Sequence, residues 1–342
     1  MTHAAPSPHR PRTVFAMAPA VRDALFDDET LALLTRVADI DPDLVVSDFH
    51  DPAAAPALSR AEALFTGWEC PPLDAAALAL MPRLRTVVHA AGSVKHHVTD
   101  ACWERGITVA SAAAANAVPV AEYTVAMILL AGKGVLPAAT AYRTRRTWLS
   151  PIETVGRRGN YRSTVGVVGA SRIGRRVMEL LRPYDLRVLL YDPYVDEQEA
   201  AALGARSTSL DELARSSQVV TVHAPQLPET HHLFDRDRLR LMPDGATLVN
   251  TARGALVDTA ALTAELLSGR LSAVLDVTEP EVLPADSPLY ALPNVLLTPH
   301  IAGSLGNELT RMARAAVEEL ARYANGLPFL DPVCPEALAR SA

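Results

Sequence analysis

A glycine-rich turn between a buried strand and a helix constrains this chain more than any other feature. Residues 164–174, TVGVVGASRIG, place a short apolar run directly before three small residues, Gly169, Ser171 and Gly174. This order is the context that a dinucleotide-binding fingerprint requires, because glycine allows the tight turn and the close approach of helix and strand. Unpaired N–H groups at the start of the helix can then face a pyrophosphate. The turn therefore predicts a parallel α/β domain that binds a dinucleotide.

Two residues qualify this prediction. Ser171 stands where glycine usually clears space for the phosphate, so it either shifts the pyrophosphate slightly or donates its hydroxyl to it. The next strand ends in Asp192, whose carboxylate can accept hydrogen bonds from the adenosine ribose hydroxyls. A 2′-phosphate would meet that carboxylate as a like charge, which favours NAD over NADP. Alternatively, Asp192 only caps a turn before Pro193.

Short apolar strands alternate with helical patterns along most of the chain, which is typical of parallel sheets with crossover helices. A length of 342 residues favours two domains. The first array has strand candidates at 13–17, 44–47, 63–66, 86–89 and 107–110. The second has them at 165–168, 188–191, 219–223, 247–250, 273–276 and 295–297. We therefore expect an α/β chain with two doubly wound parallel sheets.

Two long helical patterns set the expected domain boundaries. Residues 119–135 predict one bridging helix with Pro119 at its start, and residues 309–323 predict another after the second array is complete. This last helix is therefore expected to pack on the first domain. The expected parts are a disordered tail at 1–12, a substrate-binding domain of 13–118 plus 302–342, and a cofactor domain of 119–301.

Composition excludes several classes of function. The net charge of −7 disfavours nucleic acid, whose phosphates require concentrated Lys and Arg. Three cysteines without close pairing or metal-ligand spacing predict reduced thiols in the cytoplasm and no metal site. The first dozen residues lack the apolar run of a secretory signal. The apolar stretch within 117–131 contains Glu122 and is shorter than the ~20 residues that a membrane helix needs.

Three further segments supply side chains for chemistry. NTARGALVD (250–258), LDVTEPE (275–281) and TPHIAG (298–303) each follow a strand candidate of the second array, so they should meet at the carboxyl edge of one sheet. Arg253 offers a planar fork that matches a carboxylate. His300 can carry a proton near neutral pH, and a carboxylate at its second ring nitrogen would fix its tautomer.

These segments, together with NAVPVAE (116–122), VHAPQLPET (222–230) and LPNVLLTPHIAG (292–303), resemble the D-isomer-specific 2-hydroxyacid dehydrogenase family over residues 80–305. The resemblance implies a Rossmann cofactor domain inserted into a flavodoxin-like substrate domain. It also implies that Arg253 binds the substrate, that His300 is the acid/base, and that Glu281 is its partner. Glu279 competes for that last role, because the family's usual EP pair reads EV here, and spacing favours Glu281.

The resemblance assigns further residues to cofactor and substrate. Asp276 would hold the nicotinamide carboxamide. The implied cofactor residues are Gly169, Ser171, Arg172, Ile173, Gly174, Asp192, His223, Ala224, Pro225, Thr230, Thr251, Asp276 and Gly303. In the substrate loop AAGSVKHHV (90–98), Gly92 and Ser93 fall where backbone N–H groups grip the carboxylate, which Arg253 also binds.

Lys95 departs from the family, whose members often have Asp at this position. It is either an ordinary solvated lysine or, together with His96 beside it, the receptor for a second anionic group on the substrate. His231 and His232 read as surface residues and receive no function here.

The expected function is NAD(H)-dependent interconversion of a small 2-keto acid and its D-2-hydroxy acid, with reduction favoured. The alternative is an NAD-sensing regulatory protein of the same fold. Formate oxidation is disfavoured, since those relatives place glutamine beside the histidine, and L-specific lactate or malate enzymes are disfavoured because their glycine-rich turn opens the chain. The resemblance also implies a homodimer formed near residues 119–160, a segment that contains Trp148.

Overall fold

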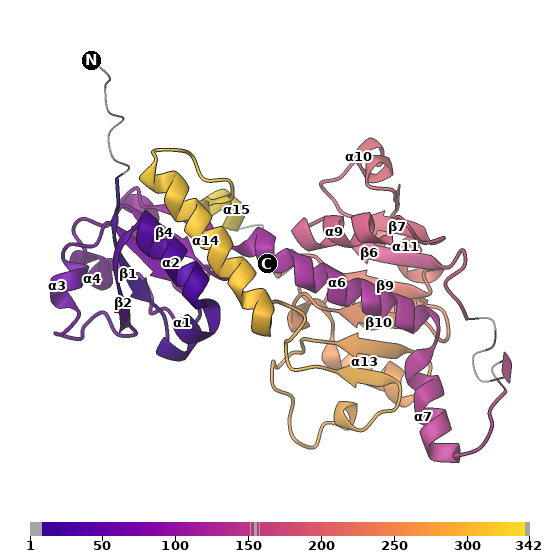
Figure 1. The fold of residues 1–342 in the computed structure, drawn as a ribbon. Helices are drawn as coiled ribbons and strands as arrows, with labels where there is room; N and C mark the ends of the chain where they lie inside the picture. Colours follow the sequence, from indigo (N-terminus) through magenta and orange to yellow (C-terminus); the bar gives the residue numbers. More distant parts are fainter. Residues whose placement is uncertain (1–8, 151, 154–155, 157, 339–342) are drawn as a thin grey trace. The chain divides into compact units, whose positions relative to one another are not determined.

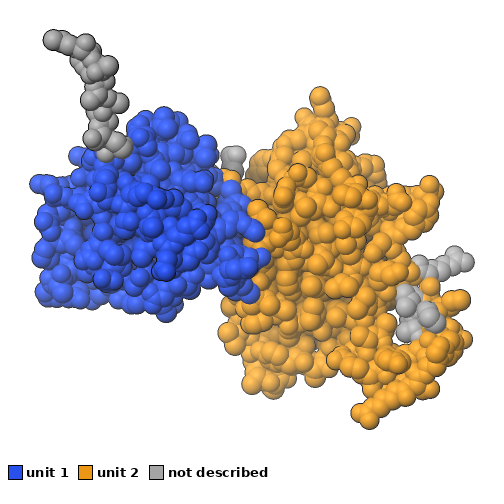
Figure 2. All heavy atoms as spheres, in the orientation of Figure 1, with its two compact units in different colours: residues 1–116, 304–339 blue, residues 117–303, 340–342 orange. Residues whose placement is uncertain are grey.

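The computed structural model describes residues 9–150, 152–153, 156 and 158–338 (Figure 1). Within them the chain forms two compact units, coloured separately in Figure 2: unit 1 contains the residues up to Asn116 and those from Ser304 onward, and unit 2 contains Ala117–Gly303. Of the tail expected at 1–12, residues 1–8 lie outside the described part. Arg12 already belongs to the first strand, where it pairs with Asp39.

Unit 1 is built on a six-stranded sheet with the order β13-β5-β4-β3-β1-β2. Its strands are β1 (Arg12–Ala16), β2 (Asp39–Val46), β3 (Ala63–Thr66), β4 (Thr86–His89), β5 (Thr108–Ser111) and β13 (Pro332–Val333). The first five strands are parallel in the order 2-1-3-4-5, the flavodoxin-like arrangement. The predicted doubly wound parallel sheet is confirmed. The sequence did not predict β13, which adds to its edge antiparallel to β5 and is too short to show a pattern.

Helices cover both faces of this sheet, so its inner strands are buried on both sides. One face carries α1 (Pro19–Leu25), α2 (Asp28–Val37) and α14 (Leu309–Ala324), and the other carries α3 (Ala55–Leu58), α4 (Ala75–Ala79) and α5 (Asp100–Glu104). Alternate side chains of β1 belong to the cores on the two faces of the sheet. Phe15 packs edge to face against Phe26 and Phe65 on the first side, and Val14 and Ala16 join the core on the second. A short helix, α15 (Pro335–Leu338), follows β13.

Unit 2 contains a seven-stranded sheet with the order β12-β11-β10-β9-β6-β7-β8. The strands, all parallel, are β6 (Thr164–Val168), β7 (Arg187–Tyr191), β8 (Arg206–Ser207), β9 (Val219–Val222), β10 (Thr247–Asn250), β11 (Ser272–Leu275) and β12 (Val295–Leu297). Read from β8, the order is 3-2-1-4-5-6 with one strand added, so the predicted Rossmann sheet is confirmed. Only the two-residue β8 was not foreseen.

Two layers of helices enclose the sheet of unit 2 (Figure 1). Residues of α6 (Ala113–Gly132), α9 (Arg172–Leu181) and α10 (Glu197–Ala202) share one core with Val165 and Val167, and α11 (Leu210–Ser216), α12 (Arg236–Leu241) and α13 (Thr259–Leu267) form the other core. Between those valines, Gly166 faces α11 so closely that a Cβ there would lie 2.3 Å from Leu213 Cδ2. A further helix, α7 (Val135–Arg145), follows α6 and has no buried residue.

The helix expected at 119–135 differs from α6 in two respects. α6 begins six residues earlier, so Pro119 lies inside it rather than at its first turn. A proline inside a helix removes one backbone hydrogen bond, but α6 is stabilised by tertiary packing, because Ala121, Val125 and Ile128 are buried in the core beneath it.

With 20 residues and a mean hydropathy of 1.5, α6 is also long and apolar enough to cross a membrane, contrary to the length argument made from the sequence. Core helices of water-soluble proteins share these properties.

Each unit buries histidines near a strand end. His97 in unit 1 lies beside His89, with ring centroids 4.5 Å apart, and both rings contact the Thr66 hydroxyl. Burial lowers the pKa of His97 to about 4, with a smaller effect from His96, and lowers the pKa of His223 in unit 2 to about 3. These rings are therefore neutral in the native state over a range in which exposed imidazoles are charged.

Acid should destabilise the chain through these histidines. An unfolded histidine takes up a proton near pH ~6.5, whereas native His97 has a pKa of about 4, so between these values only the unfolded state gains the proton. From about pH 7 to pH 5 the free energy of unfolding should fall by about 2 kcal/mol on account of His97. In urea denaturation, the free energy of unfolding of His97→Gln should fall less than that of wild type, by this amount, over the same pH range. The variant His50→Gln, which changes an exposed histidine, should behave as wild type. An equal fall in both variants would contradict the prediction.

Candidate active site

The three chemistry-bearing segments leave adjacent strands of unit 2. The NTARG segment follows β10, the DVTEPE segment follows β11 and the TPHIAG segment follows β12, and these strands are neighbours in the sheet. Since the strands are parallel, all three segments emerge at the same carboxyl edge, where open α/β sheets bind ligands. The arrangement gathers Arg253, Glu281 and His300 at that edge.

The side chain of Asn250 shapes the turn that carries Arg253. Its Oδ1 accepts a hydrogen bond from the backbone N–H of Ala252 at 3.1 Å, and its Nδ2 donates to the carbonyl of Arg253 at 2.9 Å. The guanidinium of Arg253 is half-buried and donates to the Ala252 carbonyl at 2.6 Å. Burial lowers the pKa of Arg253, while the nearby charge of Glu281 acts in the opposite direction. A largely desolvated cation of this kind attracts an anionic ligand strongly.

His300 and Glu281 form a close pair. His300 Nδ1 lies 2.6 Å from Glu281 Oε1, and both side chains are more than half exposed. Glu279, the competing carboxylate, instead points toward His231 and His232. The Thr278 hydroxyl donates to the carbonyls of Pro280 and Glu281, which shapes the loop between the two acids. The structure therefore joins His300 to Glu281, the carboxylate that the spacing favours.

Asp276 holds the loop that carries His300. Its buried Oδ1 accepts the Thr298 hydroxyl at 2.6 Å and the Ile301 N–H at 2.8 Å, and its Oδ2 accepts the Ala302 N–H at 2.9 Å. His300 itself has a left-handed backbone, with φ of 56°. These bonds give Asp276 a positioning role that the sequence did not reveal. Its expected contact with a nicotinamide carboxamide stays a prediction, for which Oδ2 retains an accepting lone pair.

A glycine brings the Arg253 and Glu281 segments together. A Cβ on Gly254 would lie 2.1 Å from the carbonyl carbon and oxygen of Thr278, and 2.6 Å from the nitrogen of Glu279. No side chain fits in such a space. Gly254 begins the short 3₁₀ turn η2 (Gly254–Leu256), which therefore rests directly on the backbone of the loop after β11.

The glycine turn has the geometry of a dinucleotide cradle. Gly169 has φ of 95°, and a Cβ there would lie 2.7 Å from the Ala224 nitrogen. A Cβ on Gly174 would lie 2.0 Å from the Gly169 carbonyl oxygen, so the helix can approach the strand only because both residues are glycine. Ser171 is the N-cap of α9, where its hydroxyl oxygen accepts from the Gly174 N–H at 3.3 Å. That hydroxyl still has its own proton to donate to a phosphate.

Asp192 lies beside the same turn. Its Oδ2 accepts a hydrogen bond from the Ala170 N–H at 2.6 Å, and its Oδ1 accepts one from the Tyr194 N–H at 2.8 Å. The turn-capping role considered from the sequence is therefore present. It leaves free lone pairs on both oxygens, because a carboxylate accepts about four hydrogen bonds.

The other expected cofactor residues lie around this edge of unit 2. Arg172 and Ile173 form the first turn of α9, Ala224 packs on Gly169, and Gly303 closes the TPHIAG segment. Thr230 binds the Pro225 carbonyl at 2.6 Å, and Thr251 pairs with the Thr124 hydroxyl at 3.0 Å. Among the described residues, buried His223 Nδ1 lacks a hydrogen-bond partner. The glycine turn, the Asp192 carboxylate and the unpaired Nδ1 of His223 together fit a bound dinucleotide.

Gly92, Ser93 and Lys95 belong to unit 1, in the loop after β4. Beneath the loop lie the buried rings of His89 and His97, and the Lys95 N–H lies 3.5 Å from the Ser93 hydroxyl. A Cβ on Gly92 would lie 3.4 Å from Asn116 Nδ2, which is ordinary contact. Lys95 and His96 are exposed.

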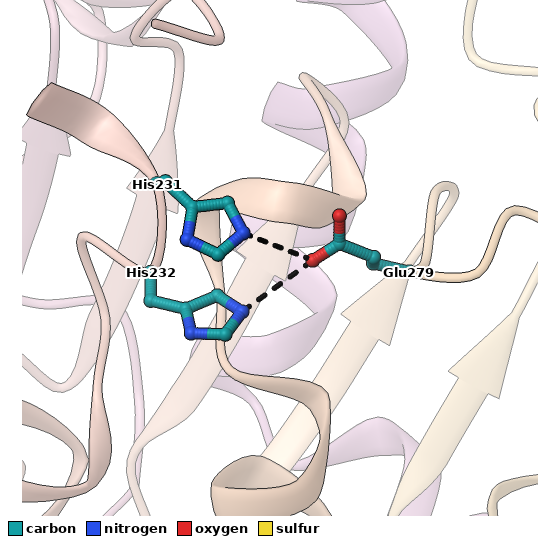
Figure 3. A group of neighbouring side chains, drawn as sticks. All are labelled: His231, His232 and Glu279. Carbon is teal, nitrogen blue, oxygen red and sulfur yellow. Dashed lines mark ion pairs between the residues drawn. The ribbon is translucent and has the colours of Figure 1, made fainter. Parts of the chain in front are cut away.

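The structure brings together one group of side chains that the sequence did not predict to meet. His231 and His232 follow the 3₁₀ turn η1 (Pro228–Thr230), and both rings point toward the carboxylate of Glu279 (Figure 3). The adjacent histidines are visible in the sequence, but their distance from the LDVTEPE segment is not. The sheet places both segments at one edge, because η1 comes after β9 and Glu279 comes after β11, with β10 between these two parallel strands.

The sequence model of the D-isomer specific 2-hydroxyacid dehydrogenase, NAD binding domain, matches residues 125–302. A glyoxylate reductase from Aeropyrum pernix is 34% identical over 310 residues, which are 87% of this chain and 90% of the relative. The chain belongs to the D-isomer specific 2-hydroxyacid dehydrogenase family. This confirms the resemblance seen in the motifs, and NAD is the cofactor of the matched domain.

Other relatives share the fold but differ in length or name. A D-3-phosphoglycerate dehydrogenase from Mycobacterium tuberculosis is 37% identical over 255 residues, which are 72% of this chain and 46% of the relative. The chain thus spans about half the length of the phosphoglycerate dehydrogenases that it matches. Among solved structures, D-mandelate dehydrogenase from Rhodotorula graminis superposes with a TM-score of 0.78 at 27% identity, covering 95% of this chain and 98% of that one.

Replacing Gly254 with alanine should disrupt this edge of the sheet. The added methyl group would overlap the Thr278 carbonyl, and backbone atoms cannot move aside as a flexible side chain can. Overpacking of this kind should lower the free energy of unfolding by about 1–3 kcal/mol or more, measured by urea denaturation. Gly159→Ala is the matched control, because a Cβ there meets nothing within 4 Å. Equal stability of the two variants would refute the close backbone contact.

Proposed function

We propose that this protein is an NAD(H)-dependent oxidoreductase that interconverts a small 2-keto acid and its D-2-hydroxy acid. The observation that carries the proposal is the 2.6 Å pair of His300 and Glu281 at the sheet edge that also bears Arg253. Family membership and the glyoxylate reductase and phosphoglycerate dehydrogenase relatives support the same class of reaction. We favour the reductive direction.

In this reaction each of the three side chains has a separate task. Arg253 binds the substrate carboxylate through its planar fork, which a lysine would not reproduce. Glu281 accepts a hydrogen bond from the Nδ1–H of His300, so the other ring nitrogen faces the substrate and carries the proton to be transferred. When bound, NADH supplies the hydride that adds to C2. His300 Nε2 then gives its proton to the substrate oxygen, and the reverse transfer starts the oxidation.

The turn and Asp192 hold the cofactor in this proposal. The N-terminus of α9 stabilises the pyrophosphate through its first-turn N–H groups and its dipole. Asp192 accepts hydrogen bonds from the ribose hydroxyls and repels a 2′-phosphate, which gives the preference for NAD over NADP. The substrate is a 2-keto acid, and one with a second anionic group would be accepted if Lys95 is the receptor rather than an ordinary solvated lysine.

Removing the proton donor should abolish most turnover. His300→Ala should lower kcat by roughly 10²- to 10⁴-fold, the usual contribution of a general acid/base, in NADH oxidation assays with glyoxylate, hydroxypyruvate and pyruvate. Glu281→Gln should also lower kcat, whereas Glu279→Gln should retain most of it because Glu279 is turned away from His300. NADH binding by His300→Ala serves as the folding control. Tight NADH binding by wild type without turnover of any 2-keto acid would instead favour a sensor.

Replacing Asp192 should weaken the discrimination between the two cofactors. Asp192→Ser removes the like charge and the acceptors of the ribose hydroxyls, so the ratio of kcat/KM for NADH to that for NADPH should fall by roughly 10- to 100-fold. Asp196→Ser is the matched control, because Asp196 caps α10 and serine preserves a cap. If the ratio for Asp192→Ser equals that of the control, the assignment of Asp192 is wrong.

A charge test distinguishes the two roles considered for Lys95. If Lys95 binds a second anionic group, Lys95→Ala should lower kcat/KM for a phosphorylated or dicarboxylic 2-keto acid by roughly 10- to 100-fold and leave that for glyoxylate nearly unchanged. Lys133→Ala, which removes the only other lysine of the sequence, should affect neither substrate. The absence of a penalty specific to the doubly anionic substrates would refute the binding of a second anionic group by Lys95.

A further inference from the structure

We propose that His231, His232 and Glu279 form a binding site for a divalent transition-metal ion of the zinc class, separate from the catalytic groups. His231 Nε2 lies 3.6 Å and His232 Nε2 lies 3.4 Å from the same oxygen, Glu279 Oε2 (Figure 3). The three atoms that would bind the ion all lie within 4.8 Å of one another. Imidazole and carboxylate are the ligands that zinc accepts in proteins besides thiolate.

The distances fit an ion better than they fit hydrogen bonds. Charge-assisted N–H to carboxylate bonds are about 2.7–2.9 Å long, and the neighbouring pair of His300 and Glu281 is shorter still at 2.6 Å. The Glu279 oxygen stays beyond this range from both rings. With metal bonds of about 2.0–2.2 Å, two ligands of a tetrahedral ion lie roughly 3.3–3.6 Å apart, which matches both separations.

Local backbone structure presents the two rings on one side. His232 has a left-handed conformation with φ of 51°, which is uncommon for histidine. Its ring stacks on that of His231, with centroids 3.9 Å apart and planes 25° from parallel. The Nε2 atoms of both stacked rings lie 3.4–3.6 Å from the same carboxylate oxygen, Glu279 Oε2. The conformation therefore suits a pair of ligands.

The three residues are held by backbone contacts before any ion arrives. The His232 N–H donates to the Ala255 carbonyl at 2.8 Å, and the Thr259 hydroxyl donates to the Glu279 carbonyl at 2.9 Å. The side chains of His231, His232 and Glu279 are 51%, 39% and 43% exposed, so water can reach the ion and complete its coordination. Three protein ligands with one open position is a known arrangement for zinc.

An ion here would link two loops of the same sheet edge. His231 and His232 belong to the loop after β9, and Glu279 lies two residues before Glu281 in the loop after β11. Binding would therefore restrict the motion of residues 278–281. Measured amide hydrogen exchange in this segment should slow when zinc is added.

The test is calorimetric titration of Zn²⁺ into the full chain, prepared without a histidine tag and stripped with a chelator. We expect one equivalent to bind to wild type. His231→Ala, His232→Ala and Glu279→Gln should each weaken binding by more than the roughly 10- to 100-fold that the loss of an outer partner costs. His50→Ala, which removes an exposed histidine elsewhere, should bind as wild type. Co²⁺ should give the visible absorption of a tetrahedral site in wild type and lose it in the three variants.

Two results would overturn the proposal. One is the absence of stoichiometric zinc binding in wild type, which would leave an ion triad of histidines and glutamate alone. The other is binding that persists in all three ligand variants, which would place the ion elsewhere. Circular dichroism and NADH binding of each variant establish that it is folded, and neither readout depends on turnover of a 2-keto acid.

Discussion

The close backbone contact between Gly254 and Thr278 is the constraint on which the proposed chemistry depends. Parallel pairing of β10 and β11 brings the following segments to one edge, but it does not fix the distance between Arg253 and Glu281. That distance is set because η2 rests directly on the loop after β11, where no Cβ fits. Asn250 on one side and Thr278 on the other then shape the two turns. The guanidinium of Arg253 and the carboxylate of Glu281, to which we assign the chemistry, are thus positioned mainly by backbone geometry.

Asp276 extends the same principle to the third segment. Three donors from Thr298, Ile301 and Ala302 converge on its buried carboxylate, and they fix the strained backbone at His300. The energy that holds a left-handed histidine in place therefore comes from a neighbouring strand. Rigid support beneath exposed reactive groups is what preorganised sites require.

Much of this arrangement was predictable from the sequence, and the exceptions have physical causes. The strands of both sheets were found because buried parallel strands are continuous apolar runs, and the site segments were found because each follows such a run. The start of α6 was wrong because Pro119 is tolerated inside a helix that the core stabilises. β8 and β13 are too short to carry a pattern. The convergence of His231, His232 and Glu279 depends on the order of the strands, in which only β10 separates β9 from β11, and the letters alone do not give that order.

Asp192 illustrates how one side chain can serve two structures at once. Its carboxylate receives the Ala170 N–H from the centre of the glycine turn and caps the bend at Tyr194. Evolution toward a phosphorylated cofactor therefore cannot exchange this acid for a basic residue in a single step without also loosening the loop that cradles the pyrophosphate. A lineage that changed its coenzyme would have to acquire a second substitution, one that restores a partner for that amide.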